Sequence, residues 1–204
     1  SLFGQGHGVP TSLRGLHAWL AHFDDALAEV CVAADPYAVL RYGDAETMPV
    51  QVARGLLRAL AALSDRDPFF RAEDWGRHPA SGLMRVELKD DILALIGTPD
   101  QHTHLTLLLV EAMAVSDLTA ALEPELRAMM FDTARYYGER SRAADALCEL
   151  GRIGDPAEMI ERLLAQGGED DRRLAWEVLH DLGLGTVSMD LAVRTLYAHI
   201  GVTI

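Results

Sequence analysis

Two thirteen-residue segments of this chain nearly repeat each other, 32 residues apart. The first reads ERSRAADALCELG over residues 139–151, and the second reads DRRLAWEVLHDLG over residues 171–183. The matched alanines and leucines recur at spacings of three and four, which mark one face of an α-helix, and each final glycine is typical of a helix end. The matched pairs are Arg140 with Arg172, Ala143 with Ala175, Leu147 with Leu179, Leu150 with Leu182, and Gly151 with Gly183.

A second helical pattern precedes each copy, over residues 124–131 and 156–165. These two align at a slightly different shift, with Leu126, Met129 and Met130 against Ile160, Leu163 and Leu164. A helix pair of about 30 to 45 residues that recurs imperfectly is typical of α-solenoids of the HEAT or armadillo kind. Such pairs cannot bury their apolar faces alone, so they stack. We therefore expect an all-α fold of stacked helical hairpins, with HEAT-like repeats over residues 116–204.

The rest of the chain is also helical in its periodicity, and the alternation typical of half-buried strands is nearly absent. We expect residues 11–115 to form an N-terminal helical part, with an aromatic loop at 68–82, and residues 1–10 to be a linker or a remnant of cloning. The expected helices, besides those above, cover residues 13–32, a short stretch from Pro36, and residues 48–63, 86–96, 99–114, 138–150, 170–182 and 188–200.

The longest of these, over residues 13–32, is expected to be capped by Thr11 or Ser12. Its buried stripe is expected to consist of Leu16, Leu20, Phe23, Leu27 and Val30 or Cys31. Asp35 followed by Pro36 then predicts a new helix, because aspartate caps helix starts and proline loses nothing at the first helical position.

Composition narrows the classes of partner. The chain has 204 residues, half of them hydrophobic, and a net charge of −13, so a phosphate backbone is repelled on average and nucleic acid is disfavoured as a partner. The two isolated cysteines favour a reducing cytoplasm. The apolar run LTLLLV is far too short to cross a bilayer, and no signal peptide opens the chain. The missing first methionine and the missing stop signal after the last helical pattern predict a fragment of a longer protein.

No motif predicts catalysis, a cofactor or a metal. GQGHG, residues 4–8, lacks the preceding strand and the following Walker A lysine that a phosphate loop needs, and a linker explains it better. QHTH places His102 and His104 two positions apart at a helix start, where their side chains diverge. No GxSxG elbow surrounds a nucleophile. A small helical metalloenzyme built on these two histidines and nearby carboxylates remains the alternative of a different class.

Two groups of residues are candidates for partner binding. Phe69, Phe70 and Trp75 form a non-periodic aromatic stretch, and aromatic residues dominate interface hot spots; alternatively, they fold back and cap the core. Arg135, Tyr136, Tyr137 and Arg140, with Arg142 and Arg152, form the second group. Its alternative is a solvated helix face with ion pairs to Glu139, Asp145 and Glu149.

Three segments together resemble a known family. They are LRGLHAWLAHFDDALAEVCVAADPYAVLRYGDAE (13–46), DPFFRAEDW (67–75) and ELRAMMFDTARYYGERSRAADALCELG (125–151). The chain is similar there to the helical region that follows the NTPase in bacterial NACHT-type proteins of the STAND class. The resemblance implies an intracellular, multidomain, nucleotide-regulated switch, often in antiphage defence, whose helical array senses a target or holds an oligomer. The nucleotide-binding half is absent from this chain, so no family site residue carries over.

We therefore expect a non-catalytic interaction or sensor region, with a protein partner and without a cofactor. The alternative of the same physical type is a stand-alone scaffold or adaptor.

Overall fold

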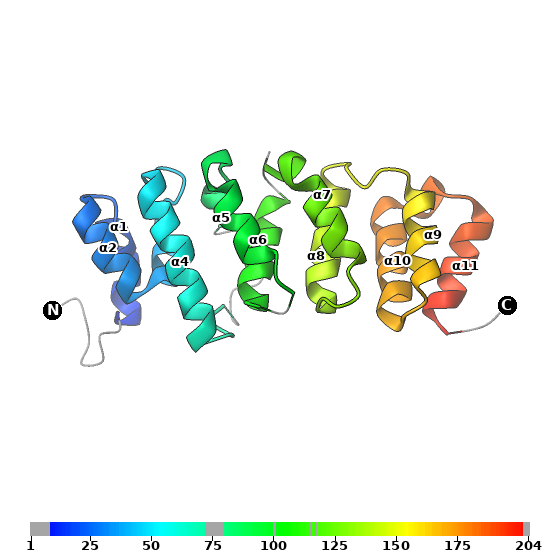
Figure 1. The fold of residues 1–204 in the computed structure, drawn as a ribbon, viewed down its shortest axis with the longest axis horizontal. Helices are drawn as coiled ribbons and strands as arrows, with labels where there is room; N and C mark the ends of the chain where they lie inside the picture. Colours follow the sequence, from blue (N-terminus) through cyan, green and yellow to red (C-terminus); the bar gives the residue numbers. More distant parts are fainter. Residues whose placement is uncertain (1–8, 72–79, 100, 115, 117, 202–204) are drawn as a thin grey trace. The chain divides into compact units, whose positions relative to one another are not determined.

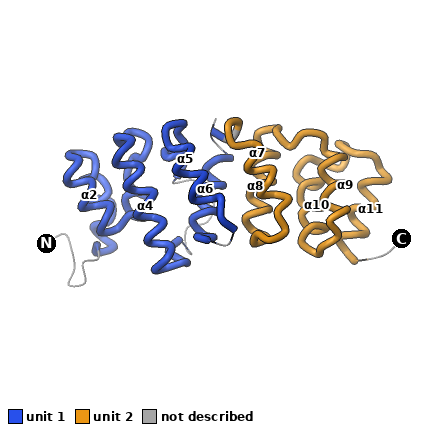
Figure 2. The backbone as a smooth tube through the Cα atoms, viewed as in Figure 1, with its two compact units in different colours: residues 1–118 blue, residues 119–204 orange. Residues whose placement is uncertain are grey.

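The computed structural model describes residues 9–71, 80–99, 101–114, 116 and 118–201. Within these ranges every regular element is helical: there are eleven α-helices and four short 3₁₀ turns, and no strand (Figure 1). The predicted all-α class is thus confirmed for this part of the chain. The chain divides into two compact units, residues 1–118 and 119–204 (Figure 2).

The described part of unit 1 contains six α-helices, and the most buried of them is α6. Every residue of α6 from Leu105 to Met113 is buried, and both α4 and α5 pack against this helix. A helix that is apolar on all sides is expected in a core, which explains the LTLLLV run. The helices are α1 Arg14–Leu20, α2 Asp25–Ala34, α3 Pro36–Tyr42, α4 Val50–Arg66, α5 Lys89–Ile96 and α6 Thr103–Met113.

The prediction of one helix over residues 13–32 is wrong, because the chain turns between α1 and α2. Asp24 starts α2 as its N-cap: its carboxylate accepts hydrogen bonds from the backbone N–H groups of Ala26 (2.8 Å) and Leu27 (3.2 Å). These bonds satisfy amides that a helix start leaves without partners, so a second helix begins there. The predicted cap is also wrong, since Leu13 occupies the N-cap of α1 without a side-chain bond.

The turn changes which side chains are buried. Most of the predicted stripe is exposed; Cys31 is buried as predicted, and the buried residues beside it are alanines and a valine. The exposed members are Leu16, Phe23, Leu27 and Val30, whereas Ala18, Ala28, Cys31 and Val32 are buried. A stripe computed across a continuous helix loses its register where the helix stops.

The start of α3 agrees with the prediction. Pro36 is its first residue, and Asp35 Oδ1 accepts a hydrogen bond from the backbone N–H of Ala38 at 3.0 Å. The other carboxylate oxygen of Asp35 lies 2.9 Å from Nε of Arg14 in α1. One aspartate therefore caps α3 and holds α1 beside it.

Unit 2 is organised around α10. The helices α8, α9 and α11 all pack against α10, which buries Leu174, Ala175, Val178 and Leu179. Only Gly167 and Gly168 separate α9 from α10, so the two helices run antiparallel (Figure 1). The helices are α7 Leu118–Phe131, α8 Tyr137–Glu149, α9 Pro156–Gln166, α10 Glu169–Leu182 and α11 Met189–His199.

The two repeated segments become α8 and α10, and their matched residues have matched environments. Ala143 and Ala175 are fully buried, as are Leu147 and Leu179. The two final glycines, Gly151 and Gly183, both have positive φ, at 61° and 90°. A side chain disfavours this backbone conformation, so glycine is suited to both helix ends.

The predicted start of α7 is wrong by six residues. The helix begins at Leu118, and Pro124 lies inside it rather than at its first position. A proline inside a helix costs about 3 kcal/mol, but burial of one leucine contributes about 1.5–3 kcal/mol. Leu118 and Leu122, both before the proline, are buried and together offset that cost.

Candidate interaction surfaces

The first predicted aromatic group is divided between core and surface. The Phe70 ring lies edge-on to the Tyr37 ring of α3, with ring centroids 5.2 Å apart. The Phe69 ring meets His104 of α6 at 5.0 Å, yet 66% of Phe69 remains exposed. Trp75 and the GQGHG segment lie outside the described residues. Phe70 therefore packs on unit 1, whereas Phe69 is available at its surface.

A buried ion pair holds this turn against α6, and sequence reasoning missed it. Arg71 Nη2 lies 2.6 Å from Oε2 of Glu111, and both side chains are buried. The signal was a lone glutamate in the otherwise apolar stretch LTLLLVEAM, because a buried carboxylate needs a cationic partner. Burial and the nearby Arg71 guanidinium lower the pKa of His104, so its imidazole is mostly neutral at pH 7.

In the second predicted group, around α8, Tyr136 is exposed, at 56%, as are Arg142 and Arg152, whereas Arg135 and Arg140 are buried. Tyr137 is half-buried, and its hydroxyl donates to the carboxylate of Glu177 in α10. The Arg173 guanidinium lies 4.2 Å from the centroid of the Tyr137 ring. Burial and the Glu177 carboxylate raise the pKa of Tyr137 well above its usual value. These contacts fix Tyr137 between α8 and α10.

Arg140 is an internal residue, which corrects its assignment to a surface patch. It is 2% exposed; its Nε donates to the carbonyl of Met130 at 3.0 Å, and its Nη2 donates to the Asp171 carboxylate. The other oxygen of Asp171 accepts a hydrogen bond from the backbone N–H of Gly168 at 2.9 Å. Arg140 thus links α7, α8 and the start of α10. An arginine can be buried in this way because its apolar stem packs while its charge is paired.

The alternative of a solvated face with helical ion pairs holds in part. Arg142 pairs with Asp145 at 2.9 Å as expected, but Arg135 is buried, with its Nη1 at 3.0 Å from Oε2 of Glu139. Arg152 does not meet Glu149; its Nη1 lies 3.5 Å from Oε2 of Glu123 in α7.

The histidines of QHTH lie in different surroundings. His102 starts α6 with a positive φ of 59°, and its Nδ1 is 3.3 Å from Oδ1 of Asp65, whereas His104 lies against Phe69. Among the described residues, no three histidine, cysteine, aspartate or glutamate side chains come together in a way that would hold a metal. The metalloenzyme alternative therefore has no ligand set in that part of the chain.

Neither cysteine has the surroundings of a reactive nucleophile. Burial raises the pKa of Cys31, and burial with nearby carboxylates raises the pKa of Cys148 to about 12. Since the thiolate is the nucleophilic form, little of it is present at neutral pH.

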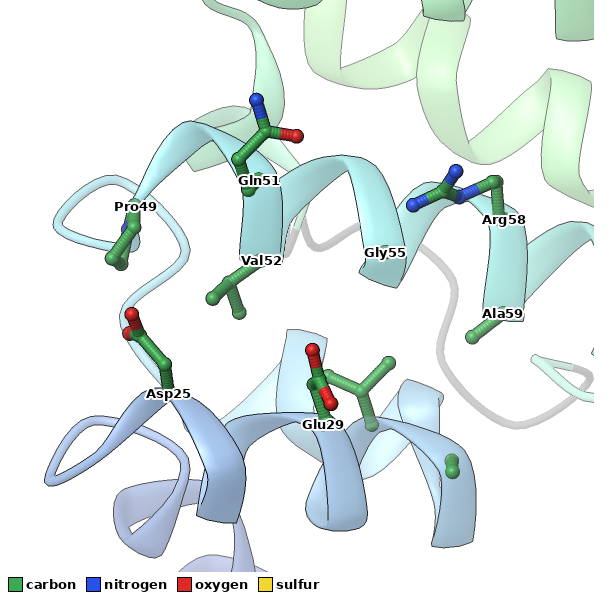
Figure 3. Close-up of a pocket in the computed structure, with 10 residues that line it drawn as sticks. Asp25, Glu29, Pro49, Gln51, Val52, Gly55, Arg58 and Ala59 are labelled. Carbon is green, nitrogen blue, oxygen red and sulfur yellow. The ribbon is translucent and has the colours of Figure 1, made fainter.

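A groove lies between α2 and α4 in unit 1 and has a volume of about 580 Å³ (Figure 3). Its floor is apolar, and its rims carry charges that form no ion pair within the described residues. The floor includes Val32, Ala33, Val52, Gly55 and Ala59; the α2 rim has Asp25 and Glu29, and the α4 side has Pro49, Gln51 and Arg58. Sequence reasoning missed this groove because it treated α2 as the end of a longer helix.

The last helix, α11, has two apolar faces. One packs on the rest of unit 2 through Leu191, Ala192 and the methyl-bearing Thr195, all of them buried. The other, called here the outer face of α11, consists of Met189, Val193, Leu196 and Ile200 and is exposed, Met189 by 78%. The spacing of four, three and four keeps these side chains on one side of the helix.

No family model, curated protein or solved structure matches this sequence. None of the helices in the described ranges is both long and apolar enough to cross a membrane.

Proposed function

We propose that this chain is a HEAT-like helical-repeat region that binds protein, within a larger bacterial NTPase of the NACHT type. The observation that carries the proposal is the outer face of α11. A terminal repeat of a free-standing helical array needs a polar outer side to stay soluble. A helix with a second, exposed apolar face is suited to the interior of a stack, where a further helix covers that face.

The repeat in unit 2 supports the same reading. The helix pairs α7–α8 and α9–α10 have similar sequences, and the matched residues Ala143 and Ala175 are both fully buried. Small residues at matched positions let neighbouring helices approach closely, and Gly151 and Gly183 end the second helix of each pair. These properties are those of a recurring structural unit.

The protein-binding role is supported by exposed apolar features. Phe69 and Tyr136 are large aromatic side chains at the surface, and the α2–α4 groove has an apolar floor. Aromatic anchors and apolar grooves are the usual basis of protein recognition. The net charge of −13 disfavours nucleic acid as the partner.

The sequence of the complete open reading frame that encodes this chain tests whether the parent protein is an NTPase. A Walker A motif upstream in the same frame supports the proposal. A start codon at the boundary of this chain removes the NTPase, and the stand-alone scaffold or adaptor then becomes the better reading.

Affinity capture from the native host, with wild type and Phe69→Ala, tests protein binding; recovery of no protein by the wild-type chain contradicts it.

A further inference from the structure

We propose that the α2–α4 groove is the docking site for a short amphipathic helix of a partner protein. This helix places aliphatic side chains on the groove floor and a lysine or arginine beside Asp25 and Glu29. The inference rests on the protein-binding function proposed above and adds the chemistry of the partner.

Gly55 is the first observation that points to a ligand. It lies inside α4, where glycine is less favourable than alanine. A Cβ atom built on Gly55 meets nothing within 4 Å, whereas one built on Gly43 or Gly82 comes within 2.5 Å of the chain's own backbone. The fold therefore needs the latter two glycines but not Gly55. The open space above Gly55 belongs to the groove floor, and it admits close approach by a side chain from outside.

The rim charges are the second, independent observation. Asp25 and Glu29 lie one helical turn apart on α2, where like charges repel, and neither has a cationic partner within the described residues. Figure 3 shows both carboxylates directed toward the gap between α2 and α4. Arg58 on the α4 side contributes one positive charge, against the two negative charges of Asp25 and Glu29. The local charge is therefore negative, and it favours a cationic side chain on the occupant.

The shape of the groove selects the kind of occupant. Two neighbouring helices with Val32 and Val52 between them form an apolar channel open to solvent. An amphipathic helix fills such a channel with aliphatic residues spaced by three and four positions. A nucleic acid would bring phosphates to the carboxylate rim, where they are repelled.

A library of random peptides displayed on phage, selected against the full chain, tests the proposal. We expect enriched peptides with two or more leucine-like residues at helical spacing and an adjacent lysine or arginine. The best peptide is then synthesised with a fluorophore and titrated by fluorescence anisotropy against wild type and variants.

Two variants address the two observations. Glu29→Arg reverses the rim charge at an exposed position and is expected to weaken binding at least tenfold; a peptide with its basic residue replaced by glutamate recovers the affinity. Gly55→Leu fills the floor and is expected to abolish binding. The matched controls are Glu158→Arg, an exposed acid on α9, and Gly15→Leu, a helical glycine with open space in α1. Both controls should bind like wild type, and circular dichroism confirms that each variant is folded.

Three results overturn the proposal: no enriched peptide family, an enriched family without basic residues, or unchanged binding by Glu29→Arg and Gly55→Leu. These outcomes are independent of the proposed parent protein. If no peptide binds the groove, a Walker A motif upstream can still support the NTPase parent. If the chain proves to be a stand-alone protein, its groove can still bind the peptides.

Discussion

Arg140 and Asp171 form a buried ion pair between α8 and α10, across 31 residues of sequence. Each partner makes a second bond: Arg140 donates to the carbonyl of Met130, and Asp171 accepts from the backbone N–H of Gly168. The pair therefore connects the end of α7, the body of α8 and the first turn of α10. If one partner is replaced by an apolar residue, the charge of the other stays buried without a counter-charge.

We predict that Arg140→Met lowers the free energy of unfolding by about 3–5 kcal/mol, because it leaves the Asp171 carboxylate buried without its cation. Urea denaturation followed by circular dichroism measures the loss. Arg142→Ala is the matched control: it removes a more exposed pair with Asp145, and such pairs contribute about 0–1 kcal/mol.

The double variant Arg140→Met with Asp171→Leu is expected to recover most of the loss, since apolar residues often replace a buried pair without net cost. The remaining deficit should be about 1–3 kcal/mol, for the two lost hydrogen bonds with the Met130 carbonyl and the Gly168 N–H. If Arg140→Met unfolds at the same urea concentration as wild type, the ion pair does not hold these helices together.

The helices α8 to α11 could be predicted closely because local signals mark their ends. Asp155 precedes Pro156 at the start of α9, and its carboxylate accepts a hydrogen bond from the N–H of Ala157 at 2.9 Å. Gly151 and Gly183 adopt the positive φ expected of glycine after a helix. Periodicity, caps and glycine stops agree at these places, so pattern alone was sufficient.

The buried charges and the groove could not be predicted in the same way. Arg140 has the pattern of a surface residue among other arginines, and only its spatial neighbour Asp171, in another helix, decides its burial. Likewise, the turn at Asp24 moves α2 into a new register, and this register places Glu29 opposite α4 (Figure 3). Pairing between distant segments is not encoded in the spacing of a single helix.

We predict that Gly55→Ala raises the free energy of unfolding by about 0.5–1 kcal/mol, because alanine favours a helix and its methyl group meets open space. Thermal unfolding measures the shift. Gly43→Ala provides the contrast, since its Cβ would lie 2.5 Å from the carbonyl oxygen of Val39, and we expect a loss of about 1–3 kcal/mol. Destabilisation by Gly55→Ala would show that the groove is occupied by the chain itself.

The two phenylalanines of the 68–71 turn should differ in their effect on stability. We predict that Phe70→Ala lowers the free energy of unfolding by about 1–2 kcal/mol, since its half-buried ring loses the edge-on contact with Tyr37. Phe69→Ala should change it by less than about 0.5 kcal/mol, as is usual for exposed positions. Chemical denaturation of both variants checks the difference, and equal effects would contradict the placement of the two rings.

The raised pKa of Tyr137 predicts how the stability of the fold changes at alkaline pH. Its pKa is raised in the folded state, first by burial and then by the Glu177 carboxylate, so folding favours the neutral phenol. The stability that this contributes is complete below the unfolded pKa of about 10 and is lost as the pH rises above it. Tyr137→Phe should therefore flatten the fall in melting temperature above about pH 10, whereas Tyr136→Phe, at an exposed position, should not. Equal slopes for both variants would contradict the assignment.

The outer face of α11 leads to the last prediction. Met189→Glu with Leu196→Glu should leave the free energy of unfolding within about 0.5 kcal/mol of wild type, because both side chains are exposed. The same change should reduce self-association at high concentration, as measured by static light scattering, since it removes an exposed apolar stripe. Leu191→Glu, on the buried face of the same helix, is the control and should unfold unit 2. Strong destabilisation by the outer-face variant would mean that the chain covers this stripe itself, and the argument for a further helix in a longer array would lose its basis.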